Sequence, residues 1–428
     1  MDELSHIKKL ANQCKYYEDL YDILWKLNED NDKKFSQNIS IGLFNIACGG
    51  FGDIIVCKTF HDYLKEWYPR SKITICTTSP EKYSELGIRG KIVHLRSKTG
   101  KDEECVEYGQ LKRIPKEKFD IMVVIPIINQ SFQINQFKKM IPYANVFNTF
   151  TVSEYNGLFP PYTFPIGVGN GNMGILLNDF KLKQQTLMKK PYAVVYIQPS
   201  PEWGIHAKYC FQSYLEMIGK NYSKHKHFEI VIPNWILEEM DGNKAFYYTV
   251  KKILGKNYKN IDIIYPDKGV FHMMEDETNK TRIVLRGDIL PQKRDIFISI
   301  MKDSVQDILV TGDQSFTDII SCCRGKRVWY QIAPWKKDFA NNLFKHMPNK
   351  YFKSFKTSCG TLQSVDTNID WKNFLKEYDF RIHGKKRFDS ILKGREQMMK
   401  TPYLKELLNI IEHSRYLETA LKKIKQLK

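Results

Sequence analysis

The sequence predicts an α/β fold made of two Rossmann-like domains that face each other across a crevice, with extra helices at both ends. Short apolar runs of strand length alternate with amphipathic helical segments along most of the chain, which is typical of doubly wound parallel sheets. The alternation stops over residues 155–190, which are rich in Gly, Pro and Asn, and then restarts. A domain has roughly 150 residues, so a chain of 428 also exceeds one domain.

We expect four segments. They are a helical extension at 1–36, a first domain at 37–180, a second domain at 181–360 and a helical segment at 361–428. The first begins with apolar residues at helical spacing over 3–28. The strands expected in the first domain are 39–47, 72–78, 91–95, 119–127 and 145–150, with helices at 53–67 and 135–141.

The second domain repeats the pattern. Its expected strands are 192–198, 228–233, 261–265, 282–285, 307–312 and 326–332, with helices at 207–222, 293–303 and 315–325. The final segment ends in the basic sequence ETALKKIKQLK. Packing of its apolar side against the protein is favoured over peripheral contact with an acidic membrane surface, which stays open.

Composition and net charge predict the compartment of the protein, the state of its thiols and the charge of its partner. The sequence has no apolar run of transmembrane length and begins without the apolar region of a secretory signal, so we expect a cytoplasmic protein. Its nine cysteines form no CxxC pair or Cys/His cluster, which predicts reduced thiols and no structural zinc. The net charge of +18 suits an anionic partner. No nucleic-acid motif is present, so we expect a nucleotide diphosphate or acidic lipid rather than nucleic acid.

A glycine loop follows the first expected strand. Gly49, Gly50 and Gly52 precede Asp53 at the carboxyl edge of the sheet, where parallel folds bind ligands. The loop lacks the third glycine and the later acidic residue of a dinucleotide fingerprint, and it lacks the GK[ST] of a P-loop. Asp53 is therefore a candidate general base for an attacking hydroxyl or amide. The alternative is a plain βα turn in which Asp53 caps the helix.

The second domain has its strongest signal after the strand at 307–312. Gly312, Asp313, Gln314 and Ser315 lie at the start of the next helix. Backbone N–H groups and the Ser315 hydroxyl would bind a phosphate there. Asp313 and Gln314 would contact ribose and sugar hydroxyls. A simple helix cap at Asp313 or Ser315 is the alternative.

Other motifs carry less information. Ser200 and Lys208 follow the strand at 192–198 and offer a second phosphate contact. The residues 169–174 match GxGxxG, but no good strand precedes them, so we interpret them as a flexible segment. Asp30 and Asp32 form a DxD in a charged linker and are attributed to chance. With no His, Cys or carboxylate set at ligand spacing, we expect no metal site.

The motifs together resemble a known enzyme group. GFGD with Asp53, YPRSKITI, and ILPQKRDIFISIMKDSVQDILVTGDQSF are similar to segments of heptosyltransferases and protein-arginine rhamnosyltransferases, which are inverting glycosyltransferases of the GT-B fold. The resemblance implies metal-independent transfer of a sugar from a nucleotide-diphosphate donor, with no cofactor. It assigns the acceptor to the first domain and the nucleotide sugar to the second.

The resemblance also implies residue roles. Asp53 corresponds to the proposed base, and Asp313 and Ser315 correspond to donor contacts. This chain has Asp313–Gln314 where the rhamnosyltransferases have Glu-Asp, which leaves the donor sugar open. The acceptor is a glycan, a lipid or a protein.

Alternatives remain on the sequence alone. A nucleotide-sugar epimerase or hydrolase of the same fold would need more acid or base groups than Asp53. A non-catalytic nucleotide-sugar-binding protein would keep only the donor site. A nucleotide-dependent oxidoreductase is opposed by the missing ribose-binding acid.

Overall fold

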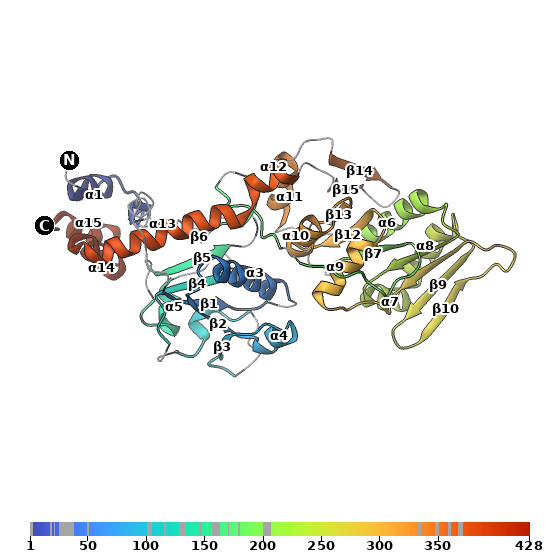
Figure 1. Ribbon diagram of the computed structural model, residues 1–428, viewed down its shortest axis with the longest axis horizontal. Coiled ribbons are helices and arrows are strands. Elements are labelled where there is room, and N and C mark those ends of the chain that lie inside the picture. The colour runs from blue at the N-terminus through green and yellow to red at the C-terminus, as the bar shows by residue number, and fades with distance from the viewer. Residues whose placement is uncertain are drawn as a thin grey trace. The chain divides into compact units, whose positions relative to one another are not determined.

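A computed structural model shows the chain as two compact units (Figure 1). It describes residues 3–17, 19–20, 22–24, 38–48, 51–100, 105–114, 117–127, 134–144, 148–153, 155, 163–169, 171–178, 180–199, 207–332, 336–346, 351–357, 361–366 and 371–428. Unit 1 comprises residues 1–176 together with 376–428, and unit 2 comprises 177–375. The expected α/β architecture with added terminal helices is confirmed.

Unit 1 is built on a six-stranded sheet in the order β3-β2-β1-β4-β5-β6, with every neighbouring pair parallel. Its strands are β1 (Ser40–Asn45), β2 (Lys72–Thr77), β3 (Lys91–His94), β4 (Ile121–Ile127), β5 (Thr149–Ser153) and β6 (Thr163–Phe164). The helices along these crossovers are α3 (Gly52–Trp67), α4 (Pro80–Glu85) and α5 (Ile134–Met140), with a 3₁₀ turn at η1 (Tyr108–Gln110). All seven residues of β4 are buried, as expected for a strand covered on both faces.

The helical ends of the chain belong to unit 1. Its terminal helices are α1 (Glu3–Ala11), α13 (Phe380–Lys400), α14 (Pro402–His413) and α15 (Leu417–Lys425). Ile7 of α1 shares one apolar core with Ile411 and Ile424 of α14 and α15. Phe388 of α13 is buried and meets the ring of Phe60 on α3. Residues after 376 therefore complete the core of the first sheet's unit.

The N-terminal helix is shorter than expected. The sequence pattern predicts one helix within 3–28, but α1 ends at Ala11 and residues 12–17 form turns. Leu20 and Leu24 follow the turns and lie in the same core as α1. The bend lets both segments bury apolar side chains against α14 and α15, which a sequence period does not reveal.

Unit 2 contains a nine-stranded sheet in the order β10-β9-β11-β8-β7-β12-β13-β15-β14. Its strands are β7 (Tyr192–Tyr196), β8 (His227–Val231), β9 (Asn260–Tyr265), β10 (Gly269–Met274), β11 (Arg282–Arg286), β12 (Asp307–Thr311), β13 (Arg327–Gln331), β14 (Phe352–Lys356) and β15 (Thr361–Asp366). The six central strands are parallel, and β10, β15 and β14 pair antiparallel at the edges. The helices are α6 (Ala207–Tyr222), α7 (Asn234–Gly242), α8 (Lys244–Gly255), α9 (Arg294–Asp303), α10 (Asp313–Cys322) and α11 (Lys337–His346). The helix α12 (Trp371–Tyr378) begins in unit 2 and ends in unit 1.

The edge strands depart from the sequence prediction. Residues from 361 are expected to be mostly helical, but β15 begins there and pairs with β13 and β14. The sequences FKSFK and TLQSVD mix polar and apolar residues. Their strand conformation depends on pairing to the parallel sheet, which local periodicity does not register.

The prediction of reduced thiols is wrong for one pair of cysteines. Cys48 and Cys105 form a disulfide, with their Cα atoms 4.6 Å apart. The backbone N–H of Cys105 donates to the carbonyl of Ala47 at 3.0 Å, so the fold brings the segment after β3 beside the end of β1. The 57-residue separation of the two cysteines hides this proximity in the sequence.

The described residues contain neither a membrane-spanning helix nor a metal-binding cluster. No helix among these residues is long and apolar enough to cross a membrane. No three His, Cys, Asp or Glu side chains among them gather closely enough to hold a metal ion.

The disulfide should stabilise unit 1 measurably. Cys48→Ser combined with Cys105→Ser is expected to lower the free energy of unfolding by about 2–4 kcal/mol, because the crosslink restricts the unfolded chain. Native-state hydrogen exchange of the β1 and β4 amides measures this change. A reducing agent should produce the same loss in the unaltered chain and none in the double variant. Equal protection in the unaltered chain and the double variant would contradict the assignment.

Candidate functional site

The carboxyl edge of the unit 1 sheet is organised by Asn45, the last residue of β1. The strand order reverses between β1 and β4, which is where open parallel sheets bind ligands. The fully buried Asn45 donates from Nδ2 to the carbonyl oxygen of Ile125 at 2.8 Å and to that of Asp53 at 3.3 Å. Its Oδ1 accepts from the Tyr83 hydroxyl at 3.0 Å. Sequence reasoning missed Asn45, although a polar residue within a buried apolar run is a detectable signal.

Asp53 lies in the first turn of α3 and is half-buried. Its Oδ2 accepts the backbone N–H of Cys48 at 2.9 Å. This bond reaches back across the loop rather than to an N–H group of α3, and Phe51 makes no side-chain cap bond. Asp53 therefore fixes the loop between β1 and α3, and Cys48 is in turn held by its disulfide.

The glycines of this loop are only partly described. Gly49 and Gly50 lie outside the described residues. Gly52 is the first residue of α3, and among the described residues a Cβ added there would meet no atom within 4 Å apart from those of its chain neighbours and its own helix backbone. Neither packing against the described residues nor a left-handed φ therefore requires glycine at this position.

The carboxyl edge of unit 2 has a corresponding reversal, between β7 and β12. Gln331, at the end of β13, accepts the N–H of Gln198 at 3.0 Å and donates to its carbonyl at 3.2 Å. The Thr311 hydroxyl donates to the Gln331 carbonyl at 3.2 Å, and Trp235 Nε1 donates to the Ile197 carbonyl at 2.9 Å. These bonds fix the ends of β7, β12 and β13 around the start of α10.

Asp313 at the start of α10 is engaged by the protein. Gly312 precedes it with φ of 80°, a left-handed conformation that favours glycine in this sharp turn. Asp313 accepts from the Tyr330 hydroxyl at 2.9 Å and pairs with Lys336 Nζ at 2.5 Å. Both members of the ion pair are buried, whereas Ser315 is half-buried. Lys336 neutralises the Asp313 carboxylate at the helix N-terminus and was not predicted from the sequence.

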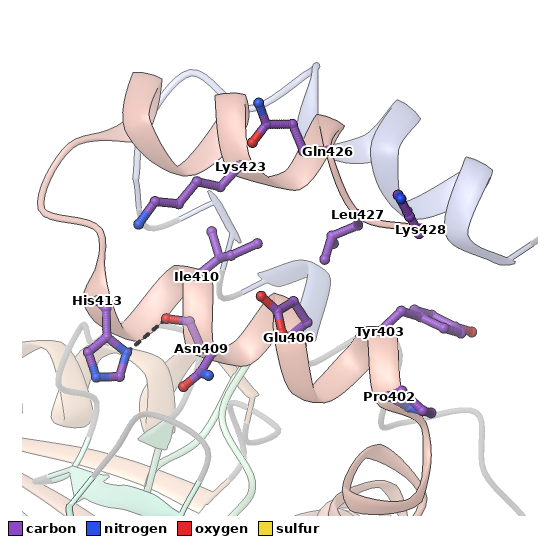
Figure 2. Close-up of a pocket in the computed structure, with 10 residues that line it drawn as sticks. All are labelled: Pro402, Tyr403, Glu406, Asn409, Ile410, His413, Lys423, Gln426, Leu427 and Lys428. Carbon is purple, nitrogen blue, oxygen red and sulfur yellow. Dashed lines mark hydrogen bonds between the residues drawn. The ribbon is translucent and has the colours of Figure 1, made fainter.

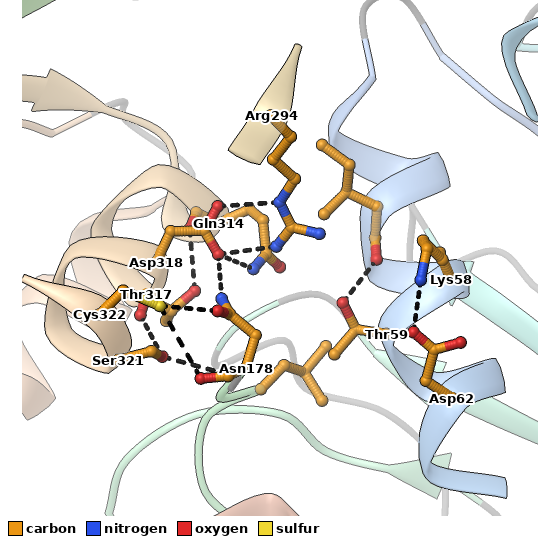
Figure 3. A network of polar contacts seen from close by, with 12 residues as sticks. Lys58, Thr59, Asp62, Asn178, Arg294, Gln314, Thr317, Asp318, Ser321 and Cys322 are labelled. Atoms are coloured by element: carbon orange, nitrogen blue, oxygen red, sulfur yellow. Dashed lines mark hydrogen bonds and ion pairs between the residues drawn. The ribbon is translucent and has the colours of Figure 1, made fainter. Parts of the chain in front are cut away.

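A polar network holds the Gln314 side chain (Figure 3). Its Nε2 donates to Asp318 Oδ1 at 3.0 Å. Arg294 binds the same carboxylate through two bonds, from Nε at 3.0 Å and from Nη2 at 2.7 Å, and the Asn178 amide donates to it as well. Arg294 also lies over the Phe180 ring, 4.8 Å from its centroid.

The network determines which atom of the Gln314 amide has no hydrogen-bond partner among the described residues. Because Nε2 points to Asp318, Oε1 points away from it. Gln314 is only 8% exposed, and Oε1 has no hydrogen-bond partner in the part of the chain that the structure describes. An unsatisfied buried acceptor costs about 1–3 kcal/mol. A ligand hydroxyl or N–H group would satisfy Oε1, and a phosphate oxygen would not.

Lys208, predicted as a phosphate contact, is engaged by a carboxylate of the protein. Lys208 on α6 pairs with Glu239 on α7 at 2.9 Å, and its ammonium, followed by the Asn243 amide, lowers the pKa of Glu239. A groove of about 620 Å³ near this pair is lined by residues that include Pro199 and Trp235. Ser200 lies outside the described residues, as do Asp30 and Asp32.

The GxGxxG match at 169–174 has a structural explanation. Gly167 and Gly174 exchange backbone hydrogen bonds of 2.8 and 2.9 Å, which pair the residues on either side of the turn. A Cβ on Gly174 would lie 2.1 Å from the carbonyl oxygen of Tyr378. Close packing therefore requires this glycine.

A further hollow of about 740 Å³ lies between α14 and α15 of unit 1 (Figure 2). Glu406, His413 and Lys423 are among its lining residues, and all three are exposed. It contains none of the predicted site residues. α15 buries Ala420 and Ile424 and leaves its lysines exposed, so its apolar side packs against the protein.

Comparisons with known proteins find only distant likeness. No protein-family model and no curated protein matches the sequence. ADP-heptose LPS heptosyltransferase II of E. coli is 12% identical, with 84% of this chain and 100% of that chain covered and a TM-score of 0.35. A glycosyltransferase from Rickettsia africae ESF-5 is 12% identical, covering 89% and 100%, with a TM-score of 0.39. MurG of Acinetobacter baumannii is 7% identical, covering 91% and 99%, with a TM-score of 0.33. These values are too low to establish a family.

The Arg294–Asp318 pair should dominate the stability of this site. Arg294→Met leaves a buried carboxylate without its cation and is expected to lower the stability of unit 2 by about 3–5 kcal/mol. Arg294→Met with Asp318→Leu should recover most of that loss, because no charge is then buried. Hydrogen exchange of the β12 and α10 amides measures both. Arg324→Met, at an exposed position, is the control, and equal effects at the two arginines would contradict the assignment.

Proposed function

We propose that this protein is a glycosyltransferase that moves a sugar from a nucleotide-diphosphate donor to an acceptor, without a metal ion and with inversion at the anomeric carbon. The observation that carries the proposal is the buried Oε1 of Gln314 in the first turn of α10, which has no hydrogen-bond partner among the described residues. It lies on the unit that would bind the nucleotide sugar. Asp53, on the other unit, would serve the acceptor.

The start of α10 suits a ligand with two kinds of polar group. Its free backbone N–H groups would bind diphosphate oxygens, which accept hydrogen bonds. Gln314 Oε1 would accept from a hydroxyl of the sugar or ribose. A nucleotide sugar offers both kinds of group side by side, and free phosphate offers no equally suitable hydroxyl.

The proposed reaction uses one base. Asp53 would take the proton of an acceptor hydroxyl or amide as that group forms a bond to the anomeric carbon. The bond from this carbon to the diphosphate oxygen breaks, and its electron pair leaves with the nucleoside diphosphate. Attack opposite the leaving group inverts the anomeric centre. The α10 N-terminus, where Lys336 neutralises Asp313, would stabilise the leaving diphosphate electrostatically.

The proposed function also includes where the protein acts and on what. The protein would act in the cytoplasm, and its acceptor would be a glycan, a lipid or a protein. Contact between the exposed lysines of α15 and an acidic membrane would favour a lipid-linked acceptor.

A second candidate has an observation in its favour. The Asp53 carboxylate already binds the Cys48 N–H, and in this candidate its role is confined to holding that bond. The protein would then be a non-catalytic nucleotide-sugar-binding protein. Both candidates share the donor site and differ only in what Asp53 does.

Asp53→Asn distinguishes these candidates. Asparagine keeps an oxygen that can accept the Cys48 N–H but is not a base. We expect turnover to fall by about 10²–10⁴ with donor affinity and thermal stability unchanged. Product formation from a panel of nucleotide sugars and acceptors provides the measurement. Full activity of a stable Asp53→Asn variant would remove the catalytic role.

Gln314→Leu tests the donor site. Loss of the Oε1 acceptor is expected to weaken nucleotide-sugar binding by about tenfold, corresponding to about 1.4 kcal/mol. Calorimetric titration with a panel of nucleotide sugars measures this affinity. Gln306→Leu is the matched control, because Gln306 is exposed just before β12 begins, at the opposite end of that strand. Unchanged affinity in Gln314→Leu would exclude Oε1 as a donor contact.

Metal removal gives an independent test. Because the N-terminus of α10 supplies the positive electrostatic potential in this proposal, EDTA should leave the rate of transfer unchanged. Activity that is lost in EDTA and restored by manganese would show that the diphosphate is stabilised by a metal instead.

A further inference from the structure

Asp53 is held at its backbone and at its side chain by two different partners. The Asn45 amide donates to the Asp53 carbonyl at 3.3 Å, and the Cys48 N–H donates to Asp53 Oδ2 at 2.9 Å. Asn45 is fully buried at the end of β1 and also bonds β4 through the Ile125 carbonyl. Cys48 lies beyond the strand and is only half-buried. The orientation of the carboxylate therefore involves a residue outside the sheet.

Cys48 is connected in turn to the segment that follows β3. Its Sγ is bonded to that of Cys105, and the Cys105 N–H donates to the Ala47 carbonyl at 3.0 Å. The crosslink joins the residue that holds the Asp53 carboxylate to a segment 57 residues further along the chain. Breaking the crosslink removes the covalent connection that fixes Cys48, while the bonds of Asn45 stay in place.

Cys105 is accessible, and its backbone conformation is unfavourable. Cys105 is exposed whereas Cys48 is half-buried, so a reagent in solution reaches the Cys105 sulfur more readily. The φ of Cys105 is 57°, in the left-handed region that costs free energy for a residue with a Cβ atom. Without the crosslink this φ is able to return to negative values, which moves the Cys105 N–H away from Ala47. Both features are typical of disulfides that are reduced reversibly.

We propose that the Cys48–Cys105 disulfide is a thiol–disulfide switch that controls turnover by orienting the Asp53 carboxylate. The inference rests on the proposed function, because Cys48 is a positioning residue for the proposed base. In the disulfide form, the Cys48 N–H holds Asp53 Oδ2 and the base is preorganised for the acceptor. In the dithiol form this bond is lost and turnover falls. Disulfides of cytoplasmic proteins are usually transient and redox-sensing, which suits the proposed compartment.

Reduction needs a dithiol as the reducing partner. One thiolate of the dithiol attacks Cys105 Sγ, the sulfur–sulfur bond of the protein breaks, and Cys48 leaves as a thiolate. The second thiol of the reductant then attacks the mixed disulfide and releases the Cys105 thiolate. The protein gains two electrons and two protons, and the dithiol becomes a disulfide. A disulfide oxidant reverses both steps.

The test measures turnover of the unaltered chain in buffers with fixed ratios of reduced to oxidised dithiothreitol. Turnover should follow the fraction of oxidised protein and should be lower by about tenfold to a hundredfold in the dithiol form, because the base is misplaced. Nucleotide-sugar affinity should not change. Cys48→Ser should give the low turnover at every ratio. Cys14→Ser removes a half-buried thiol of the same unit that forms no disulfide, and it should keep the full response.

Asp53→Asn separates positioning of the base from general support of the fold. Asparagine is not a base, so the residual turnover of this variant should be the same in the disulfide and dithiol forms. A disulfide that only stabilises unit 1 would affect this residual turnover as strongly as that of the unaltered chain. Ile411→Ala is the control for lost stability, because it opens a cavity in the core of the terminal helices. It should melt at lower temperature and keep both its turnover and its redox response.

Hydrogen exchange tests the switch without relying on activity. Reduction should accelerate exchange of the Cys48 amide by a larger factor than exchange of amides in the middle of β1, which report the general loss of stability. Equal factors would overturn the proposal, as would a disulfide that resists dithiothreitol while the protein stays folded. Turnover that is unchanged or higher in the dithiol form, or an equal loss in Asp53→Asn, would also overturn it. If no form of the protein makes product, the proposed function fails, and the Cys48 amide still shows whether the disulfide maintains the bond to Asp53.

Discussion

The carboxylate of Asp318 is the group on which the candidate site of unit 2 depends. It is almost fully buried and receives two bonds from Arg294, one from Gln314 and one from Asn178. A buried charge without such partners would be strongly destabilising. The network therefore also fixes the polarity of Gln314, because the amide nitrogen must face Asp318. One electrostatic requirement thus determines which atom of the Gln314 amide has no hydrogen-bond partner among the described residues.

In unit 1, buried polar groups at the strand-order reversal are satisfied by a neutral side chain. Asn45 uses both ends of its amide to join β1, β4 and the first turn of α3 at the strand-order reversal. Beside it, Asp53 and the Cys48–Cys105 disulfide hold the loop that leads into α3. Positions that hold a loop are also those that can present a base, so geometry alone does not separate these roles for Asp53.

Local sequence patterns determined much of the architecture. Parallel strands buried on both faces appear as continuous apolar runs, and the expected strand at 307–312 corresponds to β12 (Asp307–Thr311). The same reasoning located helix starts after the first strand of unit 1 and after β12, because a βα turn follows its strand directly. Asp53 and residues 312–315 were therefore placed correctly at the carboxyl edges of their sheets, while their functional roles stay predictions.

Only the tertiary structure decided the features that join distant parts of the chain. α13 returns to pack Phe388 against Phe60, and Cys48 meets Cys105. The strands β10, β14 and β15 form only by pairing with the edges of an existing sheet. The sequence predicted Gln314 as a ligand contact. Arg294 and Asp318 determine that its Oε1 is the atom without a hydrogen-bond partner among the described residues. These features arise from contacts that bring remote residues together, and a local pattern of hydrophobicity carries no record of which remote residue will be the partner.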